Sequence, residues 1–178
     1  ADANRYLAPY GRKIGPDPAS INSCKIGGIA ANNASGMCCG TAQNSYRTLH
    51  GLKLILADGT QLDTVNADSR ARFAEQKPEL LAGLKQLSEE VKANPELSER
   101  IRHKYRLKNT TGYSLNALTD FDDPFDMLAH LMIGSEGTLG FMAEVSYHTV
   151  PDHPFKASCL LVYADIETTC RAVTALAE

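Results

Sequence analysis

The sequence contains no tryptophan, and none of its apolar runs approaches the roughly 18 residues that a membrane-spanning helix requires. Its first ten residues also lack the basic-then-apolar order of a signal peptide. The five cysteines form no CxxC pair and the five histidines no i,i+4 pair. The sequence therefore predicts no metal site, no histidine-based triad and no assignable catalytic residue, and it favours a cytoplasmic protein with reduced thiols.

Basic clusters are equally scarce, because 18 Lys and Arg residues are outnumbered by 21 Asp and Glu residues, for a net charge of −3. Nothing resembles a footprint for a phosphate backbone, so we expect no nucleic-acid partner. With 43% hydrophobic residues in 178, the chain can bury one core. It has no initiator Met, and its last apolar stretch has no Gly or Pro terminator, so we expect a piece of a longer polypeptide.

The sequence predicts a long loop first, and strands in the middle and toward the end of the chain. Residues 11–51 are rich in Gly, Asn, Ser and Pro and predict a long ordered loop with short helices or strands. Leu52–Leu56 and Thr60–Val65 flank Asp58-Gly59 and predict an antiparallel hairpin. Leu139–Val150 alternates and predicts a half-buried strand that ends at Pro151, with one face made by Phe141, Val145 and Tyr147.

Helical periodicity dominates residues 68–108, a charged segment that we interpret as an insert of two helices packed beside the sheet. Apolar residues recur at Leu80, Leu84, Leu87 and Val91, after Pro78 and before Asn94-Pro95. A second helix is expected from Glu96 to about Tyr105, followed by a loop that reaches the 139–150 strand. The predicted fold class is α+β, an antiparallel sheet flanked by helices.

The C-terminal residues predict a further strand and helix. Lys156–Tyr163 is expected to be extended, and Asp165 can cap a helix that continues to Glu178. The residues expected to face inward on that helix are Ile166, Cys170, Val173 and Ala177. Pro151 and Pro154 suggest a joint between residues 1–151 and 152–178.

Three glycine-bearing motifs are candidate ligand contacts. The first runs through Gly15–Ser20, Ile26–Gly28 and Asn32–Gly36, the second is Gly134–Gly140, and the third is Lys108–Tyr113. Glycines let main-chain N–H groups approach a ligand closely, because no Cβ intervenes. Taken alone, the first and third motifs are better explained as ordinary turns, and the second is at least as compatible with one. None is a GxGxxG that opens a helix, so a Rossmann site is not predicted.

In order, the segments PDPAS, IGG, NNASG, LADGT, KNTTGY and GSEGTLG resemble the second half of the FAD domain in flavoproteins of the vanillyl-alcohol-oxidase (PCMH) type. The resemblance runs from about Gly15 to Pro151 and is closest to the group of D-lactate dehydrogenase, the flavin-carrying component of glycolate oxidase, and D-2-hydroxyglutarate dehydrogenase. It implies that residues 1–151 form the second lobe of an FAD-binding domain and that residues 152–178 begin a cap domain. Lys25 stands where the family usually has Thr or Ser, and Ser35 where it usually has Gly.

The resemblance also implies site residues. Those expected at the cofactor are Asp17, Pro18, Ser20, Ser23, Cys24, Lys25, Gly27, Gly28, Asn32, Asn33, Ala34, Ser35, Glu136, Gly137, Thr138, Leu139, Gly140, Phe141 and Met142. Lys108, Asn109 and Tyr113 are weaker candidates for contact with the substrate.

The activity implied is hydride transfer from a D-2-hydroxy acid to FAD, which gives a 2-oxo acid. The upstream FAD lobe and the rest of the cap would come from the same polypeptide, so the isolated chain is expected to be inactive and to hold FAD weakly or not at all. An iron–sulfur cluster elsewhere in the longer protein, an unspecified electron acceptor and peripheral attachment to the inner membrane are further expectations. Two alternatives are a cofactor-free scaffold of the same fold and a flavin reductase of the type that makes UDP-N-acetylmuramate.

Overall fold

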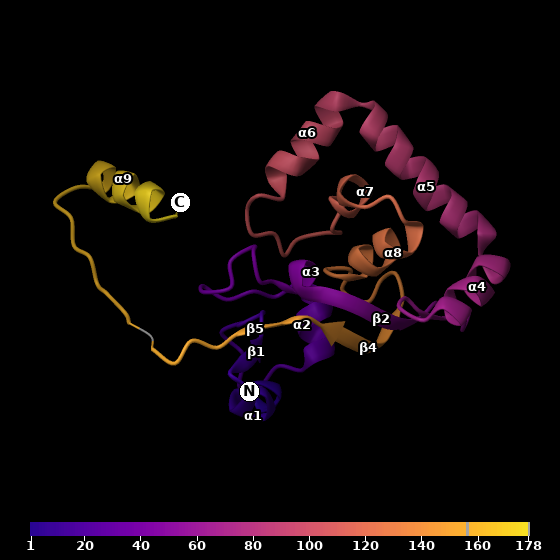
Figure 1. Ribbon diagram of the computed structural model, residues 1–178. Helices are drawn as coiled ribbons and strands as arrows, with labels where there is room; N and C mark the ends of the chain where they lie inside the picture. The colour runs from indigo at the N-terminus through magenta and orange to yellow at the C-terminus, as the bar shows by residue number, and fades with distance from the viewer. Residues whose placement is uncertain (156, 178) are drawn as a thin grey trace.

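The fold combines two small antiparallel sheets with flanking helices, as Figure 1 shows for a computed structural model that describes residues 1–155 and 157–177. One sheet has the order β3-β2-β4 and the other pairs β1 with β5. The strands are β1 (Arg12–Ile14), β2 (Leu49–Ile55), β3 (Gln61–Asp63), β4 (Phe141–Tyr147) and β5 (Thr149–Pro151). The predicted α+β class is confirmed.

A tight turn joins β2 to β3, where the sequence predicts a hairpin. Gly59 has a φ of +85°, a left-handed conformation that favours glycine, and its amide donates to the carbonyl of Leu56 at 2.9 Å. Asp58 accepts from the amide of Thr60 at 3.0 Å. The predicted hairpin is therefore confirmed.

The register of β4 changes along its length. Lys53 lies opposite Glu144, whereas the next residue, Leu54, lies opposite Met142, so β4 holds one extra residue. The bulge turns Met142 toward the core and leaves Phe141 66% exposed. The prediction that Phe141 shares the inner face with Val145 and Tyr147 is therefore wrong, because strict alternation does not continue through a bulge.

Three consecutive helices form an outer arch (Figure 1): α4 (Ala67–Gln76), α5 (Pro78–Ala93) and α6 (Pro95–Lys104). The last two are the predicted pair, and α6 starts where Asn94 accepts from the amide of Leu97 at 3.0 Å. Helix α4 is absent from the prediction because it buries only Ser69 and Phe73 and therefore shows little apolar periodicity.

Two more helices, α7 (Ala117–Asp120) and α8 (Pro124–Met132), pack inside the arch. The expectation of a loop here is wrong. Asp123 caps α8 by accepting from the amide of Phe125 at 2.9 Å. Helix α5 contacts α7 and α8, and Ser88 donates to the carbonyl of Leu118 at 2.7 Å, so these helices support the arch.

The remaining helices before the first long strand are short: α1 (Asp2–Leu7), the 3-10 turn η1 (Ala8–Tyr10), α2 (Ile26–Asn32) and α3 (Ser45–Thr48). Two of them, α2 and α3, occur within the long loop region that the sequence predicts. Helix α2 packs against β4, and its Ala30 lies in the core with Tyr46 and Leu52. The core thus joins α2 to the sheet and to α8.

The C-terminal segment departs from its prediction. Helix α9 (Ile166–Ala177) forms and is capped by Asp165, which accepts from the amide of Thr168 at 2.7 Å. Residues 157–163 form no strand, and Lys156 and Glu178 lie outside the described residues. Of the residues expected to face inward, Ile166 and Val173 are exposed, as is Cys170, and the side chain of Ala177 is not described.

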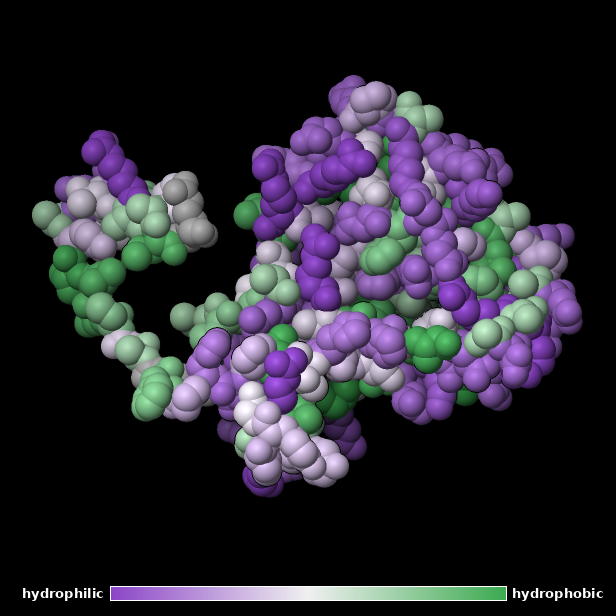
Figure 2. All heavy atoms as spheres, viewed as in Figure 1, coloured by the Kyte–Doolittle hydropathy of each residue, from purple (hydrophilic) through white to green (hydrophobic). Residues whose placement is uncertain are grey.

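The segment shows no inward face because nothing in the described chain packs over it, and Figure 2 shows its apolar side chains at the surface. Across residues 1–155 and 157–177, no helix combines the length and the apolar character needed to cross a bilayer.

Candidate functional site

The C-terminal end of α2 is joined to the loop that precedes β4. The amide of Gly134 donates to the carbonyl of Ala30 at 3.0 Å, and that of Glu136 donates to the carbonyl of Ala31 at 2.9 Å. The side-chain amide of Asn32 donates to Oε1 of Glu136 at 2.6 Å. Two of the predicted motifs, about a hundred residues apart in the sequence, therefore meet in the structure.

The third motif bridges the other two. Lys108 donates to the carbonyl of Ser35, and the side-chain amide of Asn33 lies 3.5 Å from the carbonyl oxygen of Asn109. At the other end, the Tyr113 hydroxyl lies 2.8 Å from Oγ1 of Thr138. We call residues 30–36, 108–113 and 134–138 the three-loop junction.

Backbone conformation is unusual at this junction. Asn33 and Glu136 have φ values of +50° and +53°, and in the described part of the chain no other non-glycine residue has a positive φ. Asn33 ends α2 in a left-handed cap that Asn tolerates, but a left-handed Glu is uncommon. Such conformations cost roughly 1–3 kcal/mol each and gather at ligand sites. The junction is thus held in a shape that the local sequence does not favour.

Gly27 and Gly28 have no packing role in the part of the chain that the structure describes. Both lie exposed on α2, and a Cβ at either position would meet no atom within 4 Å. A glycine inside a helix costs about 1 kcal/mol relative to Ala. Alanine at these two positions would make α2 more stable, yet the chain has glycine there and leaves the surface of the helix uncovered.

Other glycines of the same motif are required by internal contacts. A Cβ on Gly36 would lie 1.9 Å from the carbonyl oxygen of Asp17, and one on Gly15 would lie 2.2 Å from that of Gln43. The motif therefore combines glycines that pack the loop with glycines that face open space.

Asp17 holds the loop that follows the junction. Its carboxylate accepts from the amides of Gly36 at 2.9 Å, Cys38 at 3.3 Å and Cys39 at 3.2 Å. Burial by itself would raise the pKa of Asp17, but hydrogen bonds from the thiol and amide of Cys39 and from the other two amides outweigh it and lower the pKa. The negative charge is therefore part of the fold of this loop.

Replacing Asp17 with Asn should destabilise the protein by about 1–2 kcal/mol at pH 7, because a charged acceptor of three amides becomes neutral. Since the folded-state pKa lies below the unfolded value of 3.8, the carboxylate stabilises the fold above that pH and loses this effect as the pH falls through the folded pKa. Urea unfolding at pH 7 and pH 3 measures the free energies of unfolding of the wild type and D17N, and the difference between them should be smaller at pH 3 than at pH 7. A stability difference between the two proteins that is equal at both pH values would contradict this role.

The remaining predicted cofactor residues occupy two places. Ser20, Ser23, Lys25 and the half-buried Cys24 lie on the surface loop before α2, where the Ser23 hydroxyl donates to the carbonyl of Ser20 at 3.2 Å, and Pro18 is buried. Residues 137–141 line an open hollow of about 440 Å³ together with residues 55–57 of the β2–β3 hairpin. Met142 instead faces the core. Sequence reasoning missed residues 55–57 as lining residues, although Leu56 and Ala57 begin the LADGT motif.

Two buried hydroxyl groups of the junction have no hydrogen-bond partner among the described residues. The Oγ atoms of Ser35 and Ser135 are buried without a hydrogen bond. Buried polar groups are normally paired, so each unpaired hydroxyl marks a place where the chain's own hydrogen bonding is incomplete. Both serines lie in motifs that the sequence associates with the cofactor.

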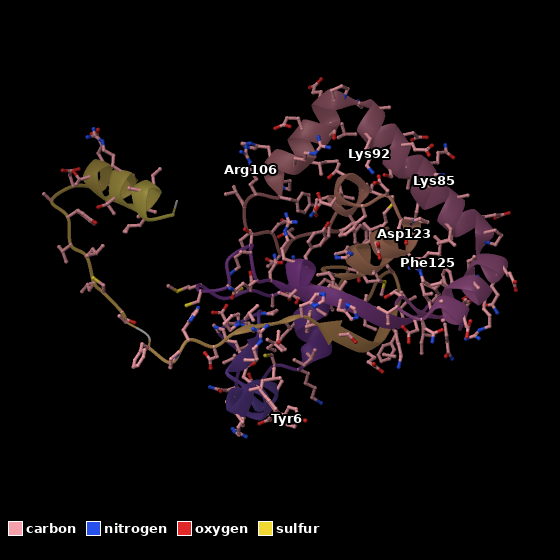
Figure 3. All side chains as sticks on the ribbon, in the orientation of Figure 1. Tyr6, Lys85, Lys92, Arg106, Asp123 and Phe125 are labelled. Atoms are coloured by element: carbon pink, nitrogen blue, oxygen red, sulfur yellow. The ribbon has the colours of Figure 1, made fainter. Side chains whose placement is uncertain are left out.

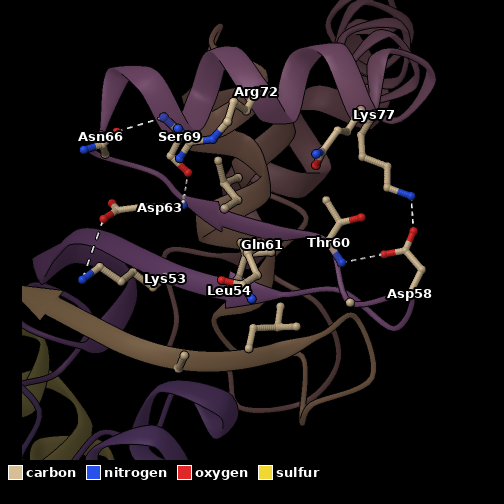
Figure 4. Close-up of a pocket in the computed structure, with 15 residues that line it drawn as sticks. Lys53, Leu54, Asp58, Thr60, Gln61, Asp63, Asn66, Ser69, Arg72 and Lys77 are labelled. Carbon is tan, nitrogen blue, oxygen red and sulfur yellow. Dashed lines mark hydrogen bonds and ion pairs between the residues drawn. The ribbon is translucent and has the colours of Figure 1, made fainter.

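A larger hollow, of about 780 Å³, lies between the hairpin and α4 (Figure 4). Its charges are largely neutralised, because Lys77 pairs with Asp58 and Lys53 pairs with Asp63 at 3.9 Å and Glu144 at 2.8 Å. It contains none of the predicted site residues and none of the buried unpaired polar atoms. We therefore place the candidate site at the three-loop junction and the adjoining 137–141 hollow. Within the described ranges, no group of three or more His, Cys, Asp or Glu side chains could hold a metal ion.

Comparison with known proteins gives one family match and three relatives. Residues 1–64 match the family described as FAD binding domain. Three curated proteins named D-2-hydroxyglutarate dehydrogenase are similar to the chain. The protein from Haemophilus influenzae is 24% identical over 94% of this chain, that from Pantoea ananatis 29% over 83%, and that from Pseudomonas putida 26% over 97%.

The chain spans only 17%, 15% and 17% of the lengths of these relatives. No solved structure matches it significantly. The matched family covers β1, α2, α3 and the β2–β3 hairpin, and the relatives extend the similarity through the junction to β4. The chain is thus similar to the FAD binding domain family over residues 1–64 and to three proteins named D-2-hydroxyglutarate dehydrogenase over most of its length.

Proposed function

We propose that this chain forms one wall of the FAD site in an enzyme that oxidises a D-2-hydroxy acid to a 2-oxo acid. The observation that carries the proposal is the meeting of three sequence-distant motifs at one junction, beside two helix glycines that the fold itself does not need. The three relatives named D-2-hydroxyglutarate dehydrogenase support this substrate class.

The residues present fit a flavin dinucleotide. The exposed surface at Gly27 and Gly28 would admit a ligand close to the backbone, and the hollow beside Gly137 has apolar walls at Leu56 and Leu139. Main-chain groups and uncharged side chains dominate this surface, as suits a large cofactor held along its length. We propose that Lys25, which is exposed just before α2, pairs with a phosphate.

The chemistry that FAD supplies when bound is acceptance of a hydride. The chain's own contribution is position, because the hydrogen bonds at Gly134 and Glu136 fix the loop against α2. Lys108 and Asn109 contact the Ser35 and Asn33 side of the junction through hydrogen bonds within the chain. Tyr113, which is 42% exposed and whose hydroxyl lies 2.8 Å from Oγ1 of Thr138, is the member of that motif that we propose contacts substrate.

The rest of the site would come from elsewhere in the polypeptide. We propose that residues 1–151 pack against a second FAD lobe and that residues 152–178 continue into a cap domain. We also propose a cytoplasmic enzyme whose electron acceptor is a separate partner. An iron–sulfur cluster elsewhere in the longer protein stays a prediction.

The natural full-length protein should purify with a flavin absorption band that bleaches anaerobically when D-2-hydroxyglutarate, D-lactate or glycolate is added. The released flavin should be FAD by mass spectrometry, and L-2-hydroxyglutarate should leave the band unchanged. A folded, colourless protein that shows no thermal shift with added FAD would instead indicate a cofactor-free scaffold. Bleaching by NADPH in place of the hydroxy acids would indicate the reductase alternative.

A further inference from the structure

A third hollow, of about 280 Å³, lies where α6 faces the loop before α3, and it is lined by three arginines. Arg47 comes from α3, Arg102 from α6 and Arg106 from the turn just beyond it, where Figure 3 labels Arg106. The other lining residues are Thr41, Tyr105, Asn116 and Asp120. Arg47 is more than fifty positions from the other two arginines in the sequence, but the fold places all three guanidinium groups around the same hollow.

No carboxylate neutralises these arginines through an ion pair within residues 1–155 and 157–177. Arg47 lies over the ring of Tyr46 at 5.7 Å, and Arg106 contacts a ring nitrogen of His103. An arginine fork left without a carboxylate or phosphate is suited to bind one from solution.

The single carboxylate in the hollow is already engaged. Asp120 accepts from the Tyr46 hydroxyl at 2.9 Å and from the side-chain amide of Asn116 at 3.0 Å. Burial, with the Asp120 carboxylate beside it, raises the pKa of Tyr46, so its hydroxyl stays protonated and donates. Three guanidinium groups against one carboxylate leave two positive charges in excess at the hollow.

Asn116 provides an independent indication of a ligand. The residue is 5% exposed and lines both the arginine hollow and an adjoining cavity of about 20 Å³, and its buried Oδ1 atom has no hydrogen-bond partner among the described residues. An unpaired buried acceptor requires a donor. A molecule with an anionic end for the arginines and a hydroxyl for Asn116 would satisfy both.

We propose that Arg47, Arg102 and Arg106, together with Asn116, form a binding site for a small anion that carries a carboxylate or phosphate group and a neighbouring hydroxyl donor. The site goes beyond the proposed flavin chemistry and does not depend on it. Its volume suits a ligand the size of a small hydroxy acid or a sugar phosphate.

Titration calorimetry of the protein with malate, succinate and inorganic phosphate tests the site. Malate should bind in the millimolar range, and succinate, which lacks the hydroxyl, should bind at least about threefold more weakly because Asn116 then stays unpaired. If phosphate binds more tightly than malate, the phosphate group is the preferred anion. If malate binds more tightly than phosphate, the carboxylate is preferred. Equal binding of malate and succinate would overturn the role of Asn116.

Arginine variants test the same site with a matched control. Arg102→Gln should weaken malate binding about tenfold, and the double variant R47Q/R102Q should abolish it. Arg100→Gln removes the same charge from α6 but does not line the hollow, so it should change the affinity less than twofold. Because all three arginines are exposed, the thermal midpoint should confirm that each variant folds. Equal weakening by R100Q and R102Q, or no binding of any probe, would overturn the proposal.

Discussion

Replacing Gly36 with Ala should destabilise the protein by about 3 kcal/mol, at the upper end of the range for overpacked sites. The new Cβ would lie 1.9 Å from the carbonyl oxygen of Asp17 and 2.4 Å from its Oδ1 atom. Neither atom can withdraw easily, because the Asp17 carboxylate is held by three amides, including that of Gly36 itself. Urea unfolding followed by circular dichroism measures the change.

Gly83→Ala is the matched control for this prediction. Gly83 lies in the middle of α5, and a Cβ there would meet no atom within 4 Å. The same substitution should therefore stabilise the protein by about 0.5 to 1 kcal/mol, because Ala is the better helix former. If Gly36→Ala unfolded at the same urea concentration as the wild type, the close packing of Gly36 on Asp17 would be wrong.

Replacing Gly28 with Ala should lower the affinity of the full-length protein for FAD at least tenfold while raising its stability. The fold leaves open space at Gly28, so Ala should stabilise α2 by up to about 1 kcal/mol. If the cofactor approaches the backbone there, the added methyl group occupies the space that the ligand needs. The measurements are the flavin-to-protein absorbance ratio and the unfolding midpoint without flavin.

Opposite signs in these two measurements distinguish a ligand-facing glycine from a structural one. Gly83→Ala should raise the stability and leave the flavin ratio at the wild-type value. A Gly28→Ala protein that is more stable and equally yellow would show that the flavin does not approach α2 at this point. A protein that is less stable would show that Gly28 has a packing role.

Local chemistry in the sequence accounts for much of the fold. The Asp58-Gly59 turn, and the prolines and asparagine that bound α5 and α6, determine structure within a few residues of themselves. The Asp123-Pro124 start of α8 is an equally local signal, but the glycine motifs on either side of that helix favour a loop. The hairpin, α5 and α6 are predictable because their signals are local and no neighbouring motif opposes them.

Other features depend on partners that the sequence does not specify. The bulge that turns Met142 toward the core and Phe141 toward solvent arises from pairing between β4 and β2, and no local residue type predicts it. Residues 157–163 have the composition of a strand but no neighbouring strand in the described chain, so they form none. Pairing and packing, rather than propensity, decide these cases.

The candidate site divides in the same way. The three motifs are visible in the sequence, but their meeting depends on hydrogen bonds such as Gly134 to Ala30. The different roles of Gly28 and Gly36 also appear only when their surroundings are known. The arginine hollow has no signal in the sequence, because Arg47 is remote from Arg102 and Arg106 along the chain.

Hydrogen–deuterium exchange of the full-length protein, with FAD bound and after its removal, tests the central claim most directly. Flavin should slow exchange together at residues 25–34 and 134–141, which are joined through Ala30 and Ala31, and leave α5 unchanged. Protection confined to regions outside residues 25–34 and 134–141 would contradict the assignment of the three-loop junction as the flavin site.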